Sequence, residues 1–115
     1  MNSVNLIGRL TKDPETRMTG GGTTVSDLRI AVNRPGRDEE PHYFTVVAYG
    51  KLADVCGEHL ESGREVAVSG RLEYREWTND QGDKRSKVEV VASQIDFLRS
   101  AGTKSEAPAE EEIAF

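Results

Sequence analysis

Apolar and polar residues alternate along most of this chain, in short stretches that turn-forming residues separate. Alternation with a period of two places successive side chains on opposite faces of a β-strand. The pattern predicts five strands, after which Ile95, Phe97 and Leu98 close the domain. The predicted strands span residues 4–10, 23–33, 42–49, 65–77 and 84–92.

The apolar spacing changes to three or four residues after the third strand, which predicts a short helix over residues 51–60. Gly63 follows as its C-terminal stop. Three consecutive glycines at 20–22 favour a hairpin tip over a phosphate-binding loop, because no Lys-Ser/Thr follows and no helix opens there. Gly8 marks a bulge or a point of close approach in the first strand. The apolar residues at helical spacing are Leu52, Val55, Cys56 and Leu60.

Three strands, a short helix and two more strands match the order of the five-stranded oligonucleotide/oligosaccharide-binding (OB) barrel. We therefore expect an all-β fold of this kind, with the helix between strands three and four. The ligand face of such a barrel comprises strands two and three and the flanking hairpin loops. The domain should occupy residues 1–99. Residues 100–115, which are small, polar and acidic, should form a disordered tail.

The formal charge of the 115 residues is −5, which is unusual for a protein that binds nucleic acid. The charge is unevenly distributed along the chain. Residues 1–99 hold 14 Lys and Arg against 16 Asp and Glu, whereas residues 100–115 hold 1 against 4. The domain is thus near neutral, so the local arrangement of its charges decides what it binds.

Cys56 is the single cysteine, so no internal disulfide can form, and this fits a reducing cytoplasm. Its place in the apolar pattern indicates a buried helix residue rather than a nucleophile. No apolar run approaches the roughly 20 residues that span a membrane. Residues 1–3 lead into a strand rather than a signal peptide. We expect a cytoplasmic protein.

Odd- and even-numbered residues of the third predicted strand point to opposite faces, and this parity separates two sets of side chains. One set suits a core or a subunit contact, and Phe44 is its candidate for an oligomer interface. The other set points two tyrosines outward. The inward set is Phe44, Val46 and Ala48, and the outward set is Tyr43, Thr45, Val47 and Tyr49.

In the fourth strand, Val66, Val68, Gly70 and Leu72 read as inward. The alternating set is Ser69, Arg71, Glu73, Arg75 and Trp77. Cations interleaved with an aromatic residue are typical of surfaces that hold single-stranded nucleic acid, where each stacked base contributes roughly 1–3 kcal/mol.

We predict that Tyr43, Tyr49 and Trp77 are stacking platforms. The candidate phosphate contacts are Arg9, Arg17, Arg34, Lys51, Arg71, Arg75, Lys84, Arg85 and Lys87. Two alternatives stay open. Tyr and Trp favour strands in any protein, so Trp77 could simply cap a hairpin. Glu73 and Glu76 also dilute the positive field.

The chain ends in three carboxylates followed by two apolar residues and a C-terminal phenylalanine, residues 110–115. A C-terminal carboxylate beside an apolar side chain is a recognised target for partner proteins. We predict a partner-binding tip formed by Glu110, Glu111, Glu112, Ile113, Ala114 and Phe115. The alternative is a solvated acidic tail.

Nothing in the sequence supports catalysis. His42 and His59 fall on different elements, with no Cys or carboxylate at metal-ligand spacing. No nucleophile elbow, paired-carboxylate cleft or nucleotide fingerprint is present. We expect neither an enzyme, nor a metal, nor a cofactor.

Several segments resemble the bacterial-type single-stranded DNA-binding proteins. Residues 1–15, MNSVNLIGRLTKDPE, resemble the opening strand and loop of that family, and residues 44–53, FTVVAYGKLA, resemble its third strand and helix start. The last hairpin is matched by Gly70-Arg71-Leu72, Trp77 and residues 88–92, VEVVA. The tip resembles the acidic end of the family, which is usually aspartate-rich with Ile-Pro-Phe.

The resemblance implies a homotetramer of barrels around which single-stranded DNA wraps with little sequence preference. It implies that the tip recruits replication, repair and recombination proteins, in association with the nucleoid. Trp77 matches the hairpin tryptophan of the family and Tyr49 its strand-three phenylalanine. Tyr43 falls where many members have tryptophan.

This chain departs from the family at several positions. Arg34-Pro35-Gly36 stands where members have a longer loop with an aromatic residue, so one platform is expected to be missing. Thr45, Glu73 and Glu76 replace basic residues of some members, and Ala114 replaces the proline of the tip. We therefore predict weaker, more salt-sensitive binding and, because the linker is short, a small reach for partners.

Two other functions stay open. One is a protein-interaction adaptor on the same barrel, like the primosomal relatives of this family, with weak nucleic-acid binding. The other is an RNA-binding barrel, because stacking alone does not distinguish ribose from deoxyribose.

Overall fold

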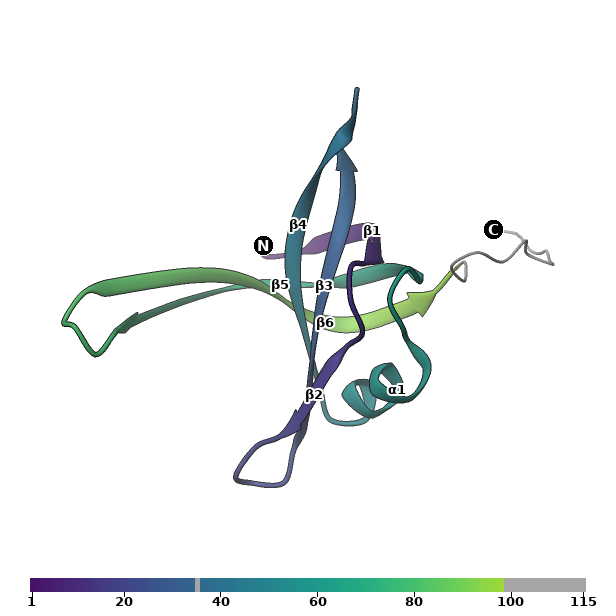
Figure 1. Ribbon diagram of the computed structural model, residues 1–115. Helices are drawn as coiled ribbons and strands as arrows, with labels where there is room; N and C mark the ends of the chain where they lie inside the picture. Colours follow the sequence, from purple (N-terminus) through teal and green to yellow (C-terminus); the bar gives the residue numbers. More distant parts are fainter. Residues whose placement is uncertain (35, 99–115) are drawn as a thin grey trace.

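The computed structural model of the chain describes residues 1–34 and 36–98, which form six strands and one helix (Figure 1). The elements are β1 (Val4–Leu10), β2 (Glu15–Met18), β3 (Thr24–Arg34), β4 (Arg37–Tyr49), α1 (Lys51–His59), β5 (Glu65–Thr78) and β6 (Lys84–Phe97). The helix follows β4 and precedes β5, which are the predicted third and fourth strands. Within the described ranges, no helix is long and apolar enough to cross a membrane.

Five of the strands close into a barrel. The strand order is β1-β5-β6-β4-β3-β2, and β1 also pairs with β3, so the ring closes and β2 lies outside it against β3. Every pairing is antiparallel except that of β4 with β6, where Val46 lies opposite Val90 and Val47 opposite Val91. The all-β OB barrel with one short helix, predicted from the sequence, is confirmed.

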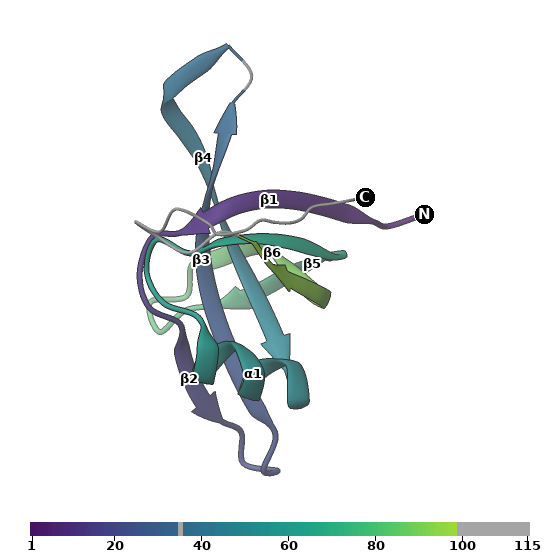
Figure 2. The same cartoon turned by 90° about the vertical axis from the view of Figure 1, so that its right-hand side faces the viewer.

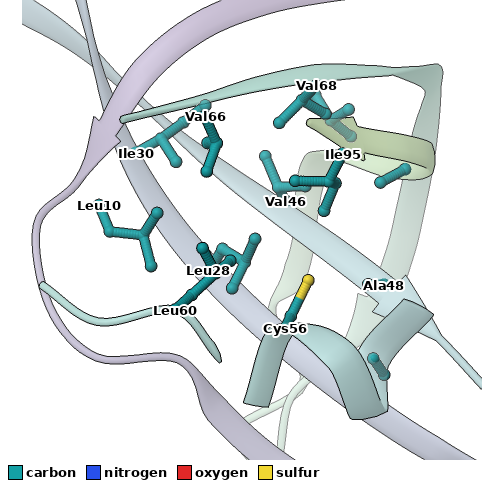
Figure 3. Packing of buried hydrophobic residues seen from close by; sticks show 13 residues of the cluster. Leu10, Leu28, Ile30, Val46, Ala48, Cys56, Leu60, Val66, Val68 and Ile95 are labelled. Atoms are coloured by element: carbon teal, nitrogen blue, oxygen red, sulfur yellow. The ribbon is translucent and has the colours of Figure 1, made fainter. Parts of the chain in front are cut away.

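The barrel interior is filled by alternating side chains of its strands, as parity predicted (Figure 3). Phe44 packs against this core, partly buried, while Val46 and Ala48 are fully buried. The helix α1 covers one end with Ala53 and Cys56, beside β2 (Figure 2). Burial raises the pKa of the Cys56 thiol to about 11, which fits the predicted inert helix residue.

Two glycines allow backbones to approach closely, one where the barrel closes and one where the β5–β6 hairpin leaves it. A Cβ at Gly8 would lie 2.5 Å from the carbonyl oxygen of Ala31, where β1 meets β3. A Cβ at Gly70 would collide with the carbonyl oxygen of Val91 and lie 2.9 Å from Cα of Ala92. Gly70 borders the irregularity at which the register of β5 and β6 shifts.

The β5–β6 hairpin extends well beyond the barrel (Figure 1). We call residues 71–91 of this hairpin the arm. The prediction that Leu72 points into the core is wrong: its side chain is on the inward side, but 46% of its surface is exposed. The physical reason is that the strand leaves the barrel beyond Gly70, so its inward face has no opposite wall to pack against.

One additional strand and two strand boundaries also differ from the sequence prediction. β2 was not predicted; its four residues are all exposed and pair with β3 alone in the described part of the chain. β4 begins at Arg37 rather than at residue 42, and β6 continues to Phe97 rather than ending at residue 92. The glycines at 20–22 form the tip of the β2–β3 hairpin, as predicted.

Candidate nucleic-acid interface

The outer side of β3 and β4 carries both predicted tyrosine platforms. Tyr43 and Tyr49 are 52% and 40% exposed. Residues directly paired across antiparallel strands share one face of the sheet. Tyr49 therefore lies level with Val25 and, one strand further, Arg17, while Tyr43 lies level with Ala31. On the other side of Ala31, Arg9 of β1 pairs with it, so Arg9, Ala31 and Tyr43 lie level across three neighbouring strands.

Arg29 is a cation of this surface that the sequence analysis missed. Its guanidinium carbon lies 5.3 Å from the ring centroid of Tyr43, within the range of a cation–π contact. Arg29 pairs with Thr45, on the outward set of β4. The signal was available in the sequence: Leu28, Ile30 and Val32 were assigned to one face, so Arg29 had to lie on the other.

The same surface continues onto the arm. Val47 of β4 pairs with Val91 of β6, and Val91 pairs with Arg71 of β5, so these three residues share a side. Along the arm, successive pairs on that side are Glu73 with Glu89, Arg75 with Lys87, and Trp77 with Arg85. Trp77 is 46% exposed. We call the outer side of β2, β3 and β4, together with this side of the arm, the binding face.

An apolar strip crosses the middle of the binding face. Val25, Val47 and Val91 are only 2%, 2% and 6% exposed, yet they do not belong to the cluster that fills the barrel. The sequence assigned Val47 to the outward set, which is confirmed, but not its burial. The strip lies between Tyr49 and Arg71, where the barrel and arm parts of the face join, and its side chains are almost entirely covered by their neighbours.

Charge on the binding face is positive although the domain as a whole is slightly acidic. Among the side chains that the structure describes on this face, six cations stand against four carboxylates. Most of the cations are ion-paired with a carboxylate of the same face, and the exposed pairs among them contribute roughly 0–1 kcal/mol each. The cations are Arg17, Arg29, Arg71, Arg75, Arg85 and Lys87, and the carboxylates are Glu15, Asp27, Glu73 and Glu89.

The ion pairs occur on both the barrel and the arm part of the face. Arg17 bonds to Asp27 on the barrel. On the arm, Arg71 lies 3.4 Å from a carboxylate oxygen of Glu73. Arg29 and Arg85 form no ion pair with any described residue.

Three predicted phosphate contacts lie away from this face. Lys84 pairs with Thr78 on the opposite side of the arm, where it borders a shallow pocket of about 110 Å³ beside Trp77. Lys51 opens the helix two residues after Tyr49. Arg34 lies near the end of β3 and contacts Glu40 at 3.3 Å.

Other predicted features bear less on the site. His42 and His59 are exposed on separate elements. Among the described residues, no group of three or more His, Cys, Asp or Glu side chains could hold a metal ion. The predicted tip, residues 110–115, lies outside the described residues.

Exposed aromatic rings beside cations, on the ligand face of an OB barrel, define a class of nucleic-acid-binding proteins. The model of the single-strand binding protein family matches residues 1–98. The chain therefore belongs to that family, a family of DNA-binding proteins rather than enzymes, as the sequence predicted.

Named relatives agree with this assignment. The single-stranded DNA-binding protein of Clostridium perfringens is 39% identical over 101 residues, which cover 87% of this chain and 67% of that protein. The single-stranded DNA-binding protein of Thermotoga maritima is 37% identical, with 97% and 84% covered. The single-stranded DNA-binding protein of Thermus aquaticus is 40% identical over 91% of this chain, but the match spans 42% of its own length.

Proposed function

We propose that this protein binds and protects single-stranded DNA without sequence preference. The observation that supports this most is that Tyr43, Tyr49 and Trp77 lie exposed on one continuous face together with six cations. Stacking is tolerant of sequence because every base has a π-face, and cations that track phosphates read no sequence. The strand would run from the barrel, over Tyr43 and Tyr49, to Trp77 on the arm.

The phosphate contacts that we propose fall into two groups. Arg9, Arg17 and Arg29 serve the barrel part, and Arg71, Arg75, Arg85 and Lys87 serve the arm. Lys51, Lys84 and Arg34 lie outside the face and remain candidates for additional phosphate contacts. In the free protein several of these cations are already neutralised by carboxylates, which supports the prediction of weaker binding.

The proposal is tested by fluorescence anisotropy with labelled 35-nucleotide strands of oligothymidine, mixed DNA sequence and oligouridine. We expect similar affinities for the two DNA strands at ~0.15 M salt, with log affinity falling linearly against log salt concentration. A slope near zero would contradict the electrostatic part of the proposal. Feeble binding of all three strands would favour the adaptor function, and a clear preference for oligouridine would favour an RNA-binding protein.

We propose further that residues 110–115 recruit replication, repair and recombination proteins, and that the protein works in the cytoplasm with the nucleoid. The support is the acidic, apolar end of the sequence and the family. Removing residues 100–115 deletes a net charge of −3, so DNA binding should stay intact or become tighter while partner binding is lost. Unchanged pull-down of those proteins by the truncated chain would contradict the assignment.

The oligomeric state that we propose is a homotetramer, which would let one strand pass over several binding faces. Phe44 is our candidate interface residue; it lies partly buried at the edge of the core, its ring 6.3 Å from that of His42. Phe44→Glu should shift the mass measured by light scattering to a smaller species. A melting curve controls for the loss of core packing, and an unchanged mass would remove Phe44 as the candidate.

A further inference from the structure

A buried carboxylate lies in the middle of the arm's cationic side. Glu89 is only 5% exposed. Its Oε1 lies 3.1 Å from Nε of Arg75, and its Oε2 lies 3.2 Å from Nζ of Lys87. A buried charge is expensive unless it is paired, so Glu89 needs these two cations in the folded protein.

The two cations are not consumed by Glu89. Their side chains remain 53% and 47% exposed. Arg75 approaches Glu89 through Nε as an ion pair, without hydrogen-bond geometry at Oε1. The N–H groups of both terminal nitrogens of Arg75, and those of the Lys87 ammonium, remain available to a phosphate. Each side chain can therefore contact the carboxylate on one side and a phosphate on the other.

The position of Glu89 is electrostatically unfavourable. Glu73 lies directly opposite across the strands, and like charges in that position destabilise a sheet. Both carboxylates also weaken the attraction of the face for phosphate. Glu73 differs in being 41% exposed and in having one partner, Arg71, at 3.4 Å. A carboxylate that is buried and shared by two cations is placed to orient them.

We propose that Glu89 is a positioning residue for DNA binding, which holds the Arg75 guanidinium and the Lys87 ammonium side by side so that their free N–H groups receive a phosphate of the strand. This inference rests on the proposed function. The phosphate would be the one that follows or precedes the base stacked on Trp77, because the Arg75–Lys87 pair is the next pair along the same side. Glu89 itself touches no DNA.

Glu89→Gln separates the two effects of the carboxylate. The loss of one negative charge should steepen the dependence of log affinity on log salt by about 0.7 for each contacting barrel. Without the carboxylate, Arg75 and Lys87 are no longer held in place, so the DNA itself must order both side chains on binding. At high salt concentration, where the charge effect is screened, this should weaken binding roughly ten-fold. The salt curves of variant and wild type should therefore cross, the variant being tighter at low salt and weaker at high salt.

Glu73→Gln is the matched control, since it removes the opposite carboxylate, which holds one cation from an exposed position. It should steepen the salt dependence and bind at least as tightly as wild type at every salt concentration. Glu89→Asp keeps the charge, but its shorter side chain moves the carboxylate oxygens away from Arg75 and Lys87. This variant should bind more weakly at every salt concentration, with an unchanged slope of log affinity against log salt.

The experiment titrates full-length wild type and the three variants with labelled 35-nucleotide oligothymidine between ~0.05 and ~0.5 M salt. Crossing curves for Glu89→Gln support the proposal. Curves that coincide with wild type, or binding that is tighter at every salt concentration, overturn it. Failure of wild type to bind would instead refute the proposed function.

A DNA-free measurement keeps the test valid if Glu89→Gln is unstable. The Nε–H bond of Arg75 should be more ordered in wild type than in Glu89→Asp, as measured by ¹⁵N relaxation of the side chain. Equal order in the two proteins would mean that Glu89 does not hold Arg75, and this would overturn the proposal as well.

Discussion

Tyr43 and Tyr74 allow the binding face to be tested with two chemically identical changes. Tyr43 is 52% exposed on the binding face, under the guanidinium of Arg29. Tyr74 is 61% exposed on the opposite side of the arm, level with Val88, and its hydroxyl donates a hydrogen bond to Glu76. Replacing either by alanine removes an exposed tyrosine, but only the first is a proposed platform.

Tyr43→Ala should weaken binding of oligothymidine by about 5- to 150-fold, which corresponds to roughly 1–3 kcal/mol for one stacked base. The ring is about half buried, so the loss of roughly 100 Å² of apolar contact lowers the free energy of unfolding by at most about 3 kcal/mol. Tyr74→Ala should change stability by a similar or smaller amount and leave the affinity within about two-fold of wild type.

The assay is fluorescence anisotropy at ~0.15 M salt, with light scattering to confirm that both variants keep the oligomeric state of wild type. Because neither change alters charge, the salt slope should stay the same. If Tyr74→Ala weakened binding as much as Tyr43→Ala while its oligomeric state was unchanged, the assignment of the binding face would be refuted.

Two further predictions concern the fold. Gly70→Ala should lower the free energy of unfolding by about 1–3 kcal/mol in urea titrations, because its Cβ would collide with the backbone of β6. The control Gly21→Ala, whose Cβ would have no atom nearer than 4.0 Å, should change it by less than about 0.5 kcal/mol. Equal effects of the two changes would show that the close approach at Gly70 is not needed. Burial raises the pKa of the Cys56 thiol from 9.0 to about 11, so the unfolded chain releases this proton first, and the thiol's contribution to stability is complete below pH 9 and is lost as the pH rises toward 11. Urea midpoints at pH 8 and pH 10.5 should therefore fall less in Cys56→Ala than in wild type, and the same fall in both would contradict the assigned burial.

Alternation along single strands was sufficient to predict much of the fold and part of the site. It placed Phe44, Val46 and Ala48 on the core side, and it placed Tyr43 and Tyr49 together on the outer side, because parity is a local property of the strand. It was wrong about the burial of Leu72, because parity gives the side of a strand but not whether another strand lies opposite. The position at which the arm leaves the barrel is a tertiary feature.

The remaining parts of the site depend on register between strands. That Val47 lies beside Val91, and hence that the arm continues the face of the barrel, follows from a parallel pairing of β4 with β6 that no local pattern specifies. The shared position of Arg75 and Lys87 around Glu89 likewise requires the antiparallel register of the arm. β2 escaped prediction because four exposed residues, Glu15–Met18, carry no apolar alternation.

The central claim, that single-stranded DNA stacks on the binding face, is tested most directly through Trp77. It is the single tryptophan of the chain and lies 46% exposed on the arm, so its fluorescence reports one position. The measurement is a titration with 35-nucleotide oligothymidine at ~0.15 M salt. We expect strong, saturable quenching as a base stacks on the indole ring. Binding detected by anisotropy without quenching of Trp77 would contradict the path of the strand along the arm, and absence of both signals would contradict DNA binding itself.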